Sequence, residues 1–460
     1  MSERAAFAPS LRDRVSRLGY TTLWVIATPA IALYLLWRSR RQPAYRSGWG
    51  ERFLGRYRAQ SVNQRTGRCV WIHAVSVGET RAAAPLVNAL RARYPDLSLL
   101  VTHMTPTGCD TAVTLFGDQV SHAFLAYDYP FGVTNFFRHW RPLMGIVMET
   151  EIWPNLMAAA RAAGVPMLLV NGRLSAKSLG SAMRWRWLMR PAARSFTRIL
   201  AQSDDDAKRF AWLTGAADAP PIVRVGNLKF DIETPVAQRQ LAARFRDRIA
   251  SGVSMPRPVL LFASTREGEE AAIFDAWTRR VAGGTDRIGR ALPLLVVVPR
   301  HPQRFEEVAA LANARGLTIQ RRSDELSIAA DTQAWIGDSM GELLAYYLIA
   351  DVAYVGGSLL PLGGQNLIEA AAAGCPILIG PHTFNFTEAS DEAVRAGAAV
   401  RVANFDALIV EALAIASDQT RRQRMADAGI AFAAAHRGAT ERTMESIASL
   451  LRAPSRISRS

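Results

Sequence analysis

The stretch Val355–Phe386, VGGSLLPLGGQNLIEAAAAGCPILIGPHTFNF, shows the unit from which this chain is predicted to be built. A short apolar strand runs into a glycine-rich loop, a helix starts near Asn366, and CPILIGP forms a second apolar strand. Strands that are apolar throughout, with helices between them, are typical of a parallel sheet covered on both faces. The stretch therefore favours an α/β fold.

The same alternation of strands and helices occurs in two series along the chain. The first series has strand candidates at Val70–Ser76, Leu97–Met104, Ala123–Tyr127, Met144–Glu149, Pro166–Asn171, Ile199–Ser203 and Val223–Gly226. The second series begins near Pro258 with VLLFAST, LPLLVVVPRH, WIGDS, VAYVGGS, CPILIGP and AAVRVAN. Two series in 460 residues predict two doubly wound domains with a cleft between them, because ligands of such folds bind beyond the carboxyl ends of the strands.

The predicted domain boundaries follow from where these signals stop. A polar stretch, residues 232–256, has few strand signals and is predicted to connect a first domain (38–231) to a second (257–418). Residues 419–460 are predicted to form a C-terminal helix and tail. The helix, expected from about Gln419 to Leu451, has an apolar and a polar face, and we expect it to pack back across the domains.

The N-terminal region is predicted to anchor the chain in a membrane. After a basic tail (1–17), the uncharged segment Leu18–Trp37 has the roughly 20 residues needed to cross a bilayer. The denser basic flank follows this segment, so the positive-inside rule places the rest of the chain in the cytoplasm. No small-residue cleavage site follows it, which disfavours a cleaved signal peptide. A buried core helix is the structural alternative, and Pro29 leaves an interfacial position open.

Composition argues against several functional classes. The cysteines lie far apart without CxxC pairs or histidines at ligand spacing, so neither a zinc site nor a disulfide framework is predicted. The chain contains no P-loop and no GxGxxG fingerprint, which disfavours a nicotinamide enzyme. The net charge of +15 first suggests a nucleic-acid binder, but +10 of it falls within residues 1–70, around the apolar segment. Salt-dependent RNA binding would revive that alternative.

One carboxylate is placed where a general base could act. In Trp71–Thr80, WIHAVSVGET, an apolar strand runs through a turn with Gly78 into a helix. Glu79 is then expected in the first helical turn, beyond the carboxyl end of the strand. There its carboxylate either complements the helix dipole or takes a proton from an attacking hydroxyl.

Other charged groups follow later strands of the first series. Glu149 and Glu151 lie two residues apart at a strand end, and Pro154 opens the next helix. Neighbouring carboxylates raise one another's pKa, which is one way to tune a base. Lys229, one of only three lysines, lies in GNLKFD; it is either an incidental surface residue or an ammonium that neutralises a leaving phosphate.

Polar residues interrupt the strand ends of the second series in the same way. They are Ser264, Thr265 and Arg266 in FASTREGEE and Arg300 and His301 in VVVPRHPQRF, while GDSMGEL starts a helix at about Gly341. The free amides of a helix that starts near Asn366 favour a phosphate, and Glu369 one turn later suits ribose hydroxyls. Because the second series contains no DxD triplet, its pattern predicts a nucleotide-sugar site without a metal.

Taken together, these stretches resemble the bacterial 3-deoxy-D-manno-octulosonic acid (Kdo) transferases over almost the whole chain. The resemblance rests, in order, on PAYRSGWGERF, HAVSVGE, ETEIWPN, GNLKFD, STREGEE, VPRHPQRF, GDSMGEL and GGSLLPLGGQNLIEAAAAGCPILIGPHTFNF. It implies two Rossmann-like domains facing across a cleft, the GT-B type of glycosyltransferase. The acceptor would bind the first domain and CMP-Kdo the second. The implied reaction moves Kdo to the lipid A precursor, lipid IVA, in lipopolysaccharide core biosynthesis at the bacterial inner membrane, by an inverting mechanism without metal or cofactor.

The resemblance also implies roles for individual residues. Glu79 matches the catalytic base, and Glu149 and Lys229 match positions that stabilise the transition state. The implied CMP contacts are Pro299, Arg300, Met340, Gly341, Glu342, Asn366, Leu367, Ile368 and Glu369, with Ser264 and Arg266 as further candidates. Gln365 stands where other members carry His, so no contact is assigned to it. The expected partners are CMP-Kdo, the lipid A precursor and the anionic membrane, without nucleic acid; a transferase that uses a UDP-sugar is the alternative.

Overall fold

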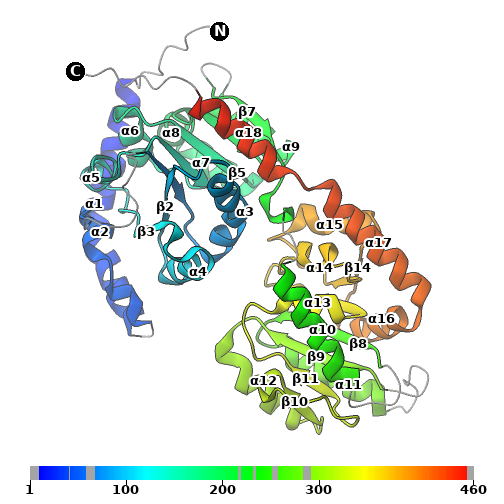
Figure 1. Cartoon of the computed structure of the whole chain (residues 1–460). Helices are drawn as coiled ribbons and strands as arrows, with labels where there is room; N and C mark the ends of the chain where they lie inside the picture. The colour runs from blue at the N-terminus through cyan, green and yellow to red at the C-terminus, as the bar shows by residue number, and fades with distance from the viewer. Residues whose placement is uncertain are drawn as a thin grey trace. The chain divides into compact units, whose positions relative to one another are not determined.

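The computed structural model describes residues 10–40, 42–57, 68–215, 219–231, 235–250, 257–282 and 292–452. The chain divides into two compact units, of which unit 1 is Met1–Asp231 with Arg437–Ser460 and unit 2 is Ile232–His436 (Figure 1). Parts of the predicted basic tail, connection and C-terminal tail (1–9, 232–234, 251–256 and 453–460) lie outside the described residues.

Unit 1 is built on a seven-stranded parallel sheet with the strand order β3-β2-β1-β4-β5-β6-β7. Its strands are β1 Cys69–His73, β2 Ser98–His103, β3 Ser121–Phe124, β4 Met144–Met148, β5 Met167–Gly172, β6 Arg198–Ala201 and β7 Ile222–Arg224. Its helices are α1 Leu11–Ser39, α2 Trp49–Leu54, α3 Val77–Arg93, α4 Pro106–Phe116, α5 Pro130–Trp140, α6 Pro154–Ala162, α7 Ala176–Arg184, α8 Arg186–Arg194, α9 Asp204–Thr214 and α18 Ala439–Leu451.

Alternate side chains of these strands enter two separate cores, which explains why the strands are apolar throughout. On β1, Val70 and Ile72 pack into the core that includes α3, α4 and α18. Trp71 between them packs on the opposite face, where its ring lies 4.7 Å from that of Phe136 on α5. All seven strands predicted for this unit form, but β3 and β7 begin and end earlier than predicted and share only two residues each with the predicted ranges.

Unit 2 repeats the architecture with a second seven-stranded parallel sheet, in the order β10-β11-β9-β8-β12-β13-β14. Its strands are β8 Val259–Thr265, β9 Leu294–Pro299, β10 Ile319–Arg321, β11 Ala334–Ile336, β12 Val352–Val355, β13 Ile377–Ile379 and β14 Ala399–Arg401. Its helices are α10 Val236–Ala250, α11 Glu269–Ala282, α12 Phe305–Asn313, α13 Leu343–Ile349, α14 Ile368–Ala372, α15 Thr387–Arg395, α16 Phe405–Ser417 and α17 Gln419–Ala435.

The predicted interdomain connection contains a helix of unit 2. Helix α10 buries Phe245, whose ring lies 5.0 Å from that of Trp335 on β11 and 4.9 Å from that of Tyr346 on α13. Through contacts among these three aromatic rings, α10 and α13 pack against β11. The stretch is polar because α10 buries only one narrow face, which includes Ala242 and Ile249.

The C-terminal region forms two helices rather than the single helix predicted from about Gln419 to Leu451. Helix α17 ends at Ala435, and Gly438 precedes α18 with φ of +87°, a left-handed conformation that interrupts an α-helix. Helix α17 packs against α14 and α16 of unit 2, whereas α18 packs against α3 of unit 1. The amide groups of Gly438 and Thr440 donate hydrogen bonds to Asp231, which ties the start of α18 to unit 1.

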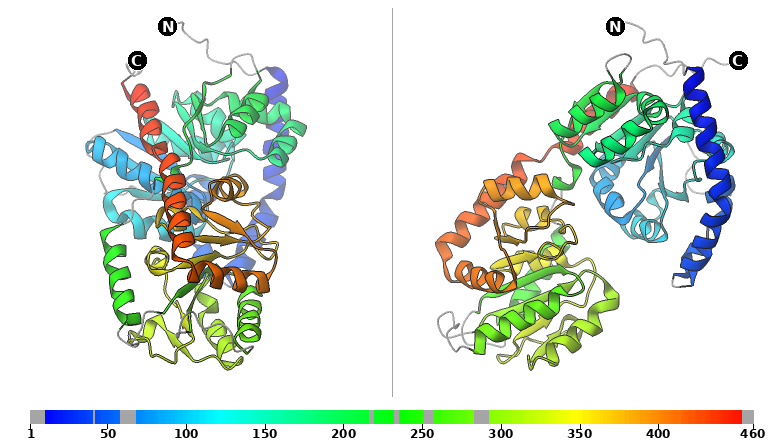
Figure 2. Two further views of the ribbon diagram at one scale, coloured as in Figure 1. Left: turned by 90° about the vertical axis from the view of Figure 1, so that its right-hand side faces the viewer. Right: turned by 180° about the vertical axis from the view of Figure 1, so that it is seen from behind.

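Helix α1 contains the segment predicted to be an anchor and extends it at both ends. Among the described residues it is the helix long and apolar enough to cross a membrane, by length and composition. Only 6% of its apolar window is buried, so it is not a buried core helix. Helix α1 runs along the rest of unit 1 (Figure 2). Trp24 contacts Tyr127 and Tyr129, whereas Ile26 and Leu33 are exposed.

Candidate functional site

The strand order of unit 1 places its candidate residues at one edge of the sheet. Strand β1 lies between β2 and β4, so the connections leave β1 and β4 in opposite directions along the sheet. Such a switch point is where α/β folds bind ligands, beyond the carboxyl ends of the strands. The segment after β1 carries Glu79, and the segment after β4 carries Glu149 and Glu151.

Glu79 stands in the first turn of α3, as predicted. Ser76 caps the helix by accepting a hydrogen bond from the Glu79 amide at 3.4 Å. The half-buried carboxylate of Glu79 accepts hydrogen bonds from the Val75 amide at 2.8 Å and from the Ser76 hydroxyl at 3.0 Å. The sequence predicts Gly78 in a turn before the helix, but α3 begins at Val77, so Gly78 lies in the first helical turn.

The surroundings of Glu79 raise its pKa to about 7. Burial is the largest cause, and the negative charges of Glu149 and Glu151 add to it, while the bonds from Val75 and Ser76 act in the opposite direction. A carboxylate that only complemented a helix dipole would have a lowered pKa. The raised value is that of a group able to accept and release a proton near neutral pH.

The two carboxylates after β4 differ in their partners. Glu149 adopts φ of +57°, a strained conformation for a residue with a side chain, and its Oε1 pairs with Lys229 Nζ at 3.1 Å. Glu151 accepts a hydrogen bond from Trp153 Nε1 at 2.7 Å. Burial, the largest cause, and the charge of Glu149 raise the pKa of Glu151.

Lys229 is held by residues that were not predicted to take part. It lies in the short 3-10 helix η4 (Leu228–Phe230), which Asn227 caps by accepting from the Lys229 amide at 3.0 Å. Buried Asn171, at the end of β5, accepts from the Leu228 amide at 3.0 Å and itself has φ of +54°. The side chain of Asn171 thus holds the segment that places Lys229 against Glu149. The side chains of Lys229 and Glu149 are 21% and 20% exposed.

Unit 2 has a corresponding switch point between β8 and β12, because β8 lies between β9 and β12. Ser264 near the end of β8 has φ of +54°, the third strained non-glycine residue at such a strand end. Gly356 follows β12, and a Cβ atom there would lie 2.5 Å from the Ser264 carbonyl oxygen. Glycine is therefore required where these two segments cross.

Two buried glutamates that no sequence pattern had indicated as functional organise this edge of the second sheet. Glu269 accepts hydrogen bonds from the amides of Arg266 and Gly357 and from the Tyr354 hydroxyl. Glu270 accepts from the Thr265 hydroxyl at 2.8 Å and forms an ion pair with Arg304 at 2.8 Å. Both lie in the STREGEE motif, but acidic residues at a helix start look the same in a sequence whether they cap or organise a loop.

Positive charge gathers beside these loops. The Arg300 amide donates to the Thr265 carbonyl at 2.9 Å, which joins the ends of β8 and β9. Burial, followed by repulsion from Arg266, Arg300 and Arg304, lowers the pKa of exposed His301. Arg266 and Arg300, both predicted, therefore form one cationic cluster with Arg304, which was not predicted and which pairs with Glu270 and Glu307. Such a cluster suits a phosphate.

The two remaining donor segments differ in detail from the prediction. Helix α13 begins at Leu343, just after Gly341 with φ of +81° and exposed Met340. The Glu342 carboxylate forms a two-pronged ion pair with Arg322, at 3.0 and 3.1 Å, and accepts from Ser339. Its oxygens therefore have partners within unit 2.

Helix α14 begins at Ile368, two residues later than expected, and has only five residues. The Ile368 amide donates to the Asn366 side chain at 3.1 Å, so the predicted cradle of free amides is smaller than expected. The side chains of Leu367 and Ile368 are buried, whereas Asn366 and Glu369 are half-buried. Any donor contact of Leu367 or Ile368 must come from the main chain.

Two Rossmann-like units of this kind place the chain in the GT-B class of fold. A crystal structure of a glycosyltransferase from Rickettsia africae aligns with a TM-score of 0.55 at 13% identity, covering 84% of this chain and 99% of that chain, which shows the shared fold. In the described residues, no group of three or more His, Cys, Asp or Glu is arranged to hold a metal ion.

The sequence relatives give the family. Residues 47–232 match the family described as "3-Deoxy-D-manno-octulosonic-acid transferase (kdotransferase)". The 3-deoxy-D-manno-octulosonic acid transferase of Bordetella pertussis is 44% identical over 384 residues, 82% of this chain and 86% of the relative. That of Haemophilus influenzae is 35% identical over 430 residues, 93% of this chain and 97% of the relative. The chain belongs to the Kdo transferase family.

Proposed function

We propose that this Kdo transferase moves Kdo from CMP-Kdo to the lipid A precursor, lipid IVA, by a metal-independent inverting displacement in lipopolysaccharide core biosynthesis. The observation that carries the proposal is Glu79, a carboxylate at the switch point of unit 1 with a pKa of about 7. Direct transfer to a sugar hydroxyl needs a base of this kind, since the hydroxyl must lose its proton as it attacks.

In the proposed step, ionised Glu79 takes the proton of the acceptor hydroxyl while that oxygen bonds to the anomeric carbon of Kdo. The bond from this carbon to the CMP phosphate oxygen breaks, and CMP leaves with the bonding electrons. A leaving phosphate is already stable as an anion, so it needs positive charge more than a proton donor. Lys229, oriented by Glu149, and the cluster around Arg300 are the cations proposed to stabilise the transition state.

The proposed CMP site lies on unit 2. Its proposed contacts are Pro299, Arg300, Met340, Gly341, Glu342, Asn366, Leu367, Ile368 and Glu369, with Ser264 and Arg266 as further candidates. The support is chemical: guanidinium groups of the cluster suit the phosphate, and the half-buried carboxylate of Glu369 suits ribose hydroxyls.

We further propose that α1 holds the enzyme at the cytoplasmic side of the bacterial inner membrane. The packed side of α1 is joined to unit 1 by polar contacts as well as by rings: Thr28 and the Tyr129 hydroxyl lie 2.6 Å apart, and Asn155 donates to Thr21 at 3.0 Å. The opposite apolar side is exposed, and the basic excess within residues 1–70 suits an anionic surface.

The test of this function is a transfer assay with purified protein, CMP-Kdo and a tetra-acylated lipid A precursor, with the product identified by mass spectrometry. A product larger than the acceptor by one or more Kdo residues is expected, and CMP should compete with the donor where UDP does not. Competition by UDP alone would instead favour a UDP-sugar donor and reject the proposal.

A further inference from the structure

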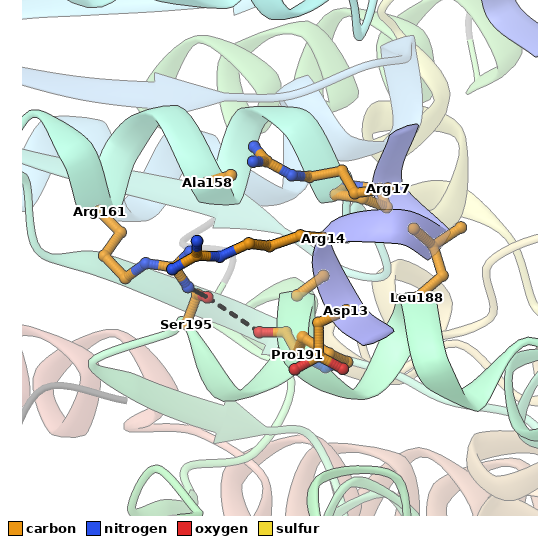
Figure 3. Close-up of a pocket in the computed structure, with 10 residues that line it drawn as sticks. Asp13, Arg14, Arg17, Ala158, Arg161, Leu188, Pro191 and Ser195 are labelled. Carbon is orange, nitrogen blue, oxygen red and sulfur yellow. Dashed lines mark hydrogen bonds between the residues drawn. The ribbon is translucent and has the colours of Figure 1, made fainter. Parts of the chain in front are cut away.

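A pocket in unit 1, outside the proposed catalytic residues, gathers three arginines from two helices. It lies between α1, α6 and α8 (Figure 3), and its lining includes Asp13, Arg14, Arg17, Arg161, Pro191 and Ser195. Three guanidinium groups face one carboxylate in this lining, which leaves the pocket with a net positive charge. A concave site of this kind is suited to an anion.

The arginines are held in position by the local structure. Arg161 on α6 donates to the Ser195 hydroxyl at 3.0 Å, and Ser195 in turn donates to the Pro191 carbonyl at 2.9 Å. Figure 3 shows Arg14 extending from α1 toward Arg161, with Arg17 above the same space. The carboxylate of Asp13 is already engaged at the helix start, where it accepts from the Ser10 amide at 2.8 Å.

The positive charges of Arg14 and Arg17 repel that of Arg161, and a bound anion would offset this repulsion. Burial, followed by repulsion from Arg17 and Arg14, lowers the pKa of Arg161, and only Asp13 acts in the opposite direction. Guanidinium groups match the oxygens of a phosphate with paired hydrogen bonds, so a phosphate fits this charge and donor set better than a carboxylate.

The surface around the pocket indicates where such a phosphate would come from. On α1, Leu11, Val15 and Leu18 are exposed by 78%, 60% and 68%. At the start of α8, Trp185 and Trp187 are exposed by 65% and 44%, and the Arg12 guanidinium lies 4.5 Å from the Trp187 ring. Exposed aliphatic side chains, tryptophans and arginines together are typical of a surface at a membrane interface.

We propose that the pocket of Arg14, Arg17 and Arg161 binds the phosphate group of a membrane lipid. Helix α1 would then do more than hold the enzyme on the membrane, because with α6 it would seat a lipid headgroup against unit 1. None of Glu79, Glu149 and Lys229 lines this pocket, so the inference adds a lipid site to the proposed reaction.

The first arm of the test measures binding of the full chain to vesicles. Phosphatidylcholine vesicles with and without phosphatidylglycerol are sedimented with wild type, Arg14→Gln and Arg161→Gln. About a fivefold loss of binding to the anionic vesicles is expected for each variant, the usual effect of one arginine near such a surface. Arg93→Gln, a matched change on α3, should leave binding unchanged, and Asp13→Asn should strengthen it.

The second arm measures the KM for the lipid acceptor in neutral detergent, and it alone rests on the proposed function. Loss of vesicle binding with an unchanged KM identifies the lipid as a bulk phospholipid, whereas a KM raised about fivefold with unchanged vesicle binding identifies it as the phosphorylated acceptor. The proposal is overturned if Arg14→Gln and Arg161→Gln match Arg93→Gln in both arms. Inorganic phosphate could also protect the wild-type chain from proteolysis while the variants change neither vesicle binding nor the KM for the lipid acceptor. That result would identify free phosphate as the ligand and reject a lipid.

Discussion

The pKa of Glu79 gives a prediction that a pH profile can decide. With a pKa of about 7, roughly a tenth of Glu79 is ionised at pH 6 and roughly nine tenths at pH 8. Because the ionised form is the base, kcat/KM should rise about tenfold between these pH values and level off above pH 8. A carboxylate with an ordinary pKa would give a flat profile over this range, so a flat profile would show that Glu79 is not the titrating base.

Neighbouring substitutions should move this inflection in opposite directions. Ser76→Ala removes a hydrogen bond that favours the ionised form, so the pKa should rise. Glu151→Gln removes a negative charge that raises it, so the pKa should fall. Both variants keep the Glu79 side chain, and shifts in the same direction would contradict this account of its environment.

The same pKa also has a consequence for stability. Folding raises the pKa of Glu79 from 4.5 to about 7, so the folded protein binds more protons than the unfolded chain between these values. Its contribution to the free energy of unfolding therefore falls as pH rises through this window, by up to about 3 kcal/mol. Glu79→Gln cannot titrate and should lose this slope in denaturant unfolding followed from pH 5 to pH 8.

Three further predictions follow from single contacts. Asn171→Ala should lower the free energy of unfolding by about 2 kcal/mol, because the variant loses the hydrogen bond from the Leu228 amide and keeps the strained φ of +54°. Asn171→Gly also loses the hydrogen bond, but glycine adopts this φ without strain, so the loss of stability should be smaller. Equal losses for the two variants would contradict this explanation. Gly356→Ala should weaken CMP binding at least about tenfold in calorimetry because its Cβ would meet the Ser264 carbonyl at 2.5 Å, whereas Gly180→Ala, which meets nothing within 4 Å, should not. Lys229→Met should lower kcat by about 10²-fold with little change in CMP affinity, and a normal kcat would remove Lys229 from the proposed chemistry.

The repeated sheets could be predicted because strands buried on both faces have a clear pattern. The missed strand, β10, shows the limit of that pattern. It is a three-residue edge strand with the sequence IQR, and all three of its residues are only half-buried. A strand of this kind has no apolar run and cannot be distinguished from a loop by sequence alone. Helix α10 was overlooked for a related reason, since only Ala242, Phe245 and Ile249 of its 15 residues are buried.

The candidate site could be predicted only as far as its residues follow strand ends. Glu79 and Glu149 met that condition, and both lie at the switch point of unit 1. Asn171 and Glu269 act through partners 57 and 88 residues away in the sequence, the amides of Leu228 and Gly357. Such partners depend on how the strands are ordered in the sheet, which no local pattern shows.

The proposed chemistry requires that Glu79 supplies the base while unit 2 binds the nucleotide. Its most direct test is a single-turnover transfer from CMP-Kdo to lipid IVA by wild type and Glu79→Gln, with CMP affinity measured on the same preparations. We expect the variant to lose at least about 10²-fold in rate and to bind CMP as tightly as wild type. Transfer by Glu79→Gln at the wild-type rate would show that another group takes the proton.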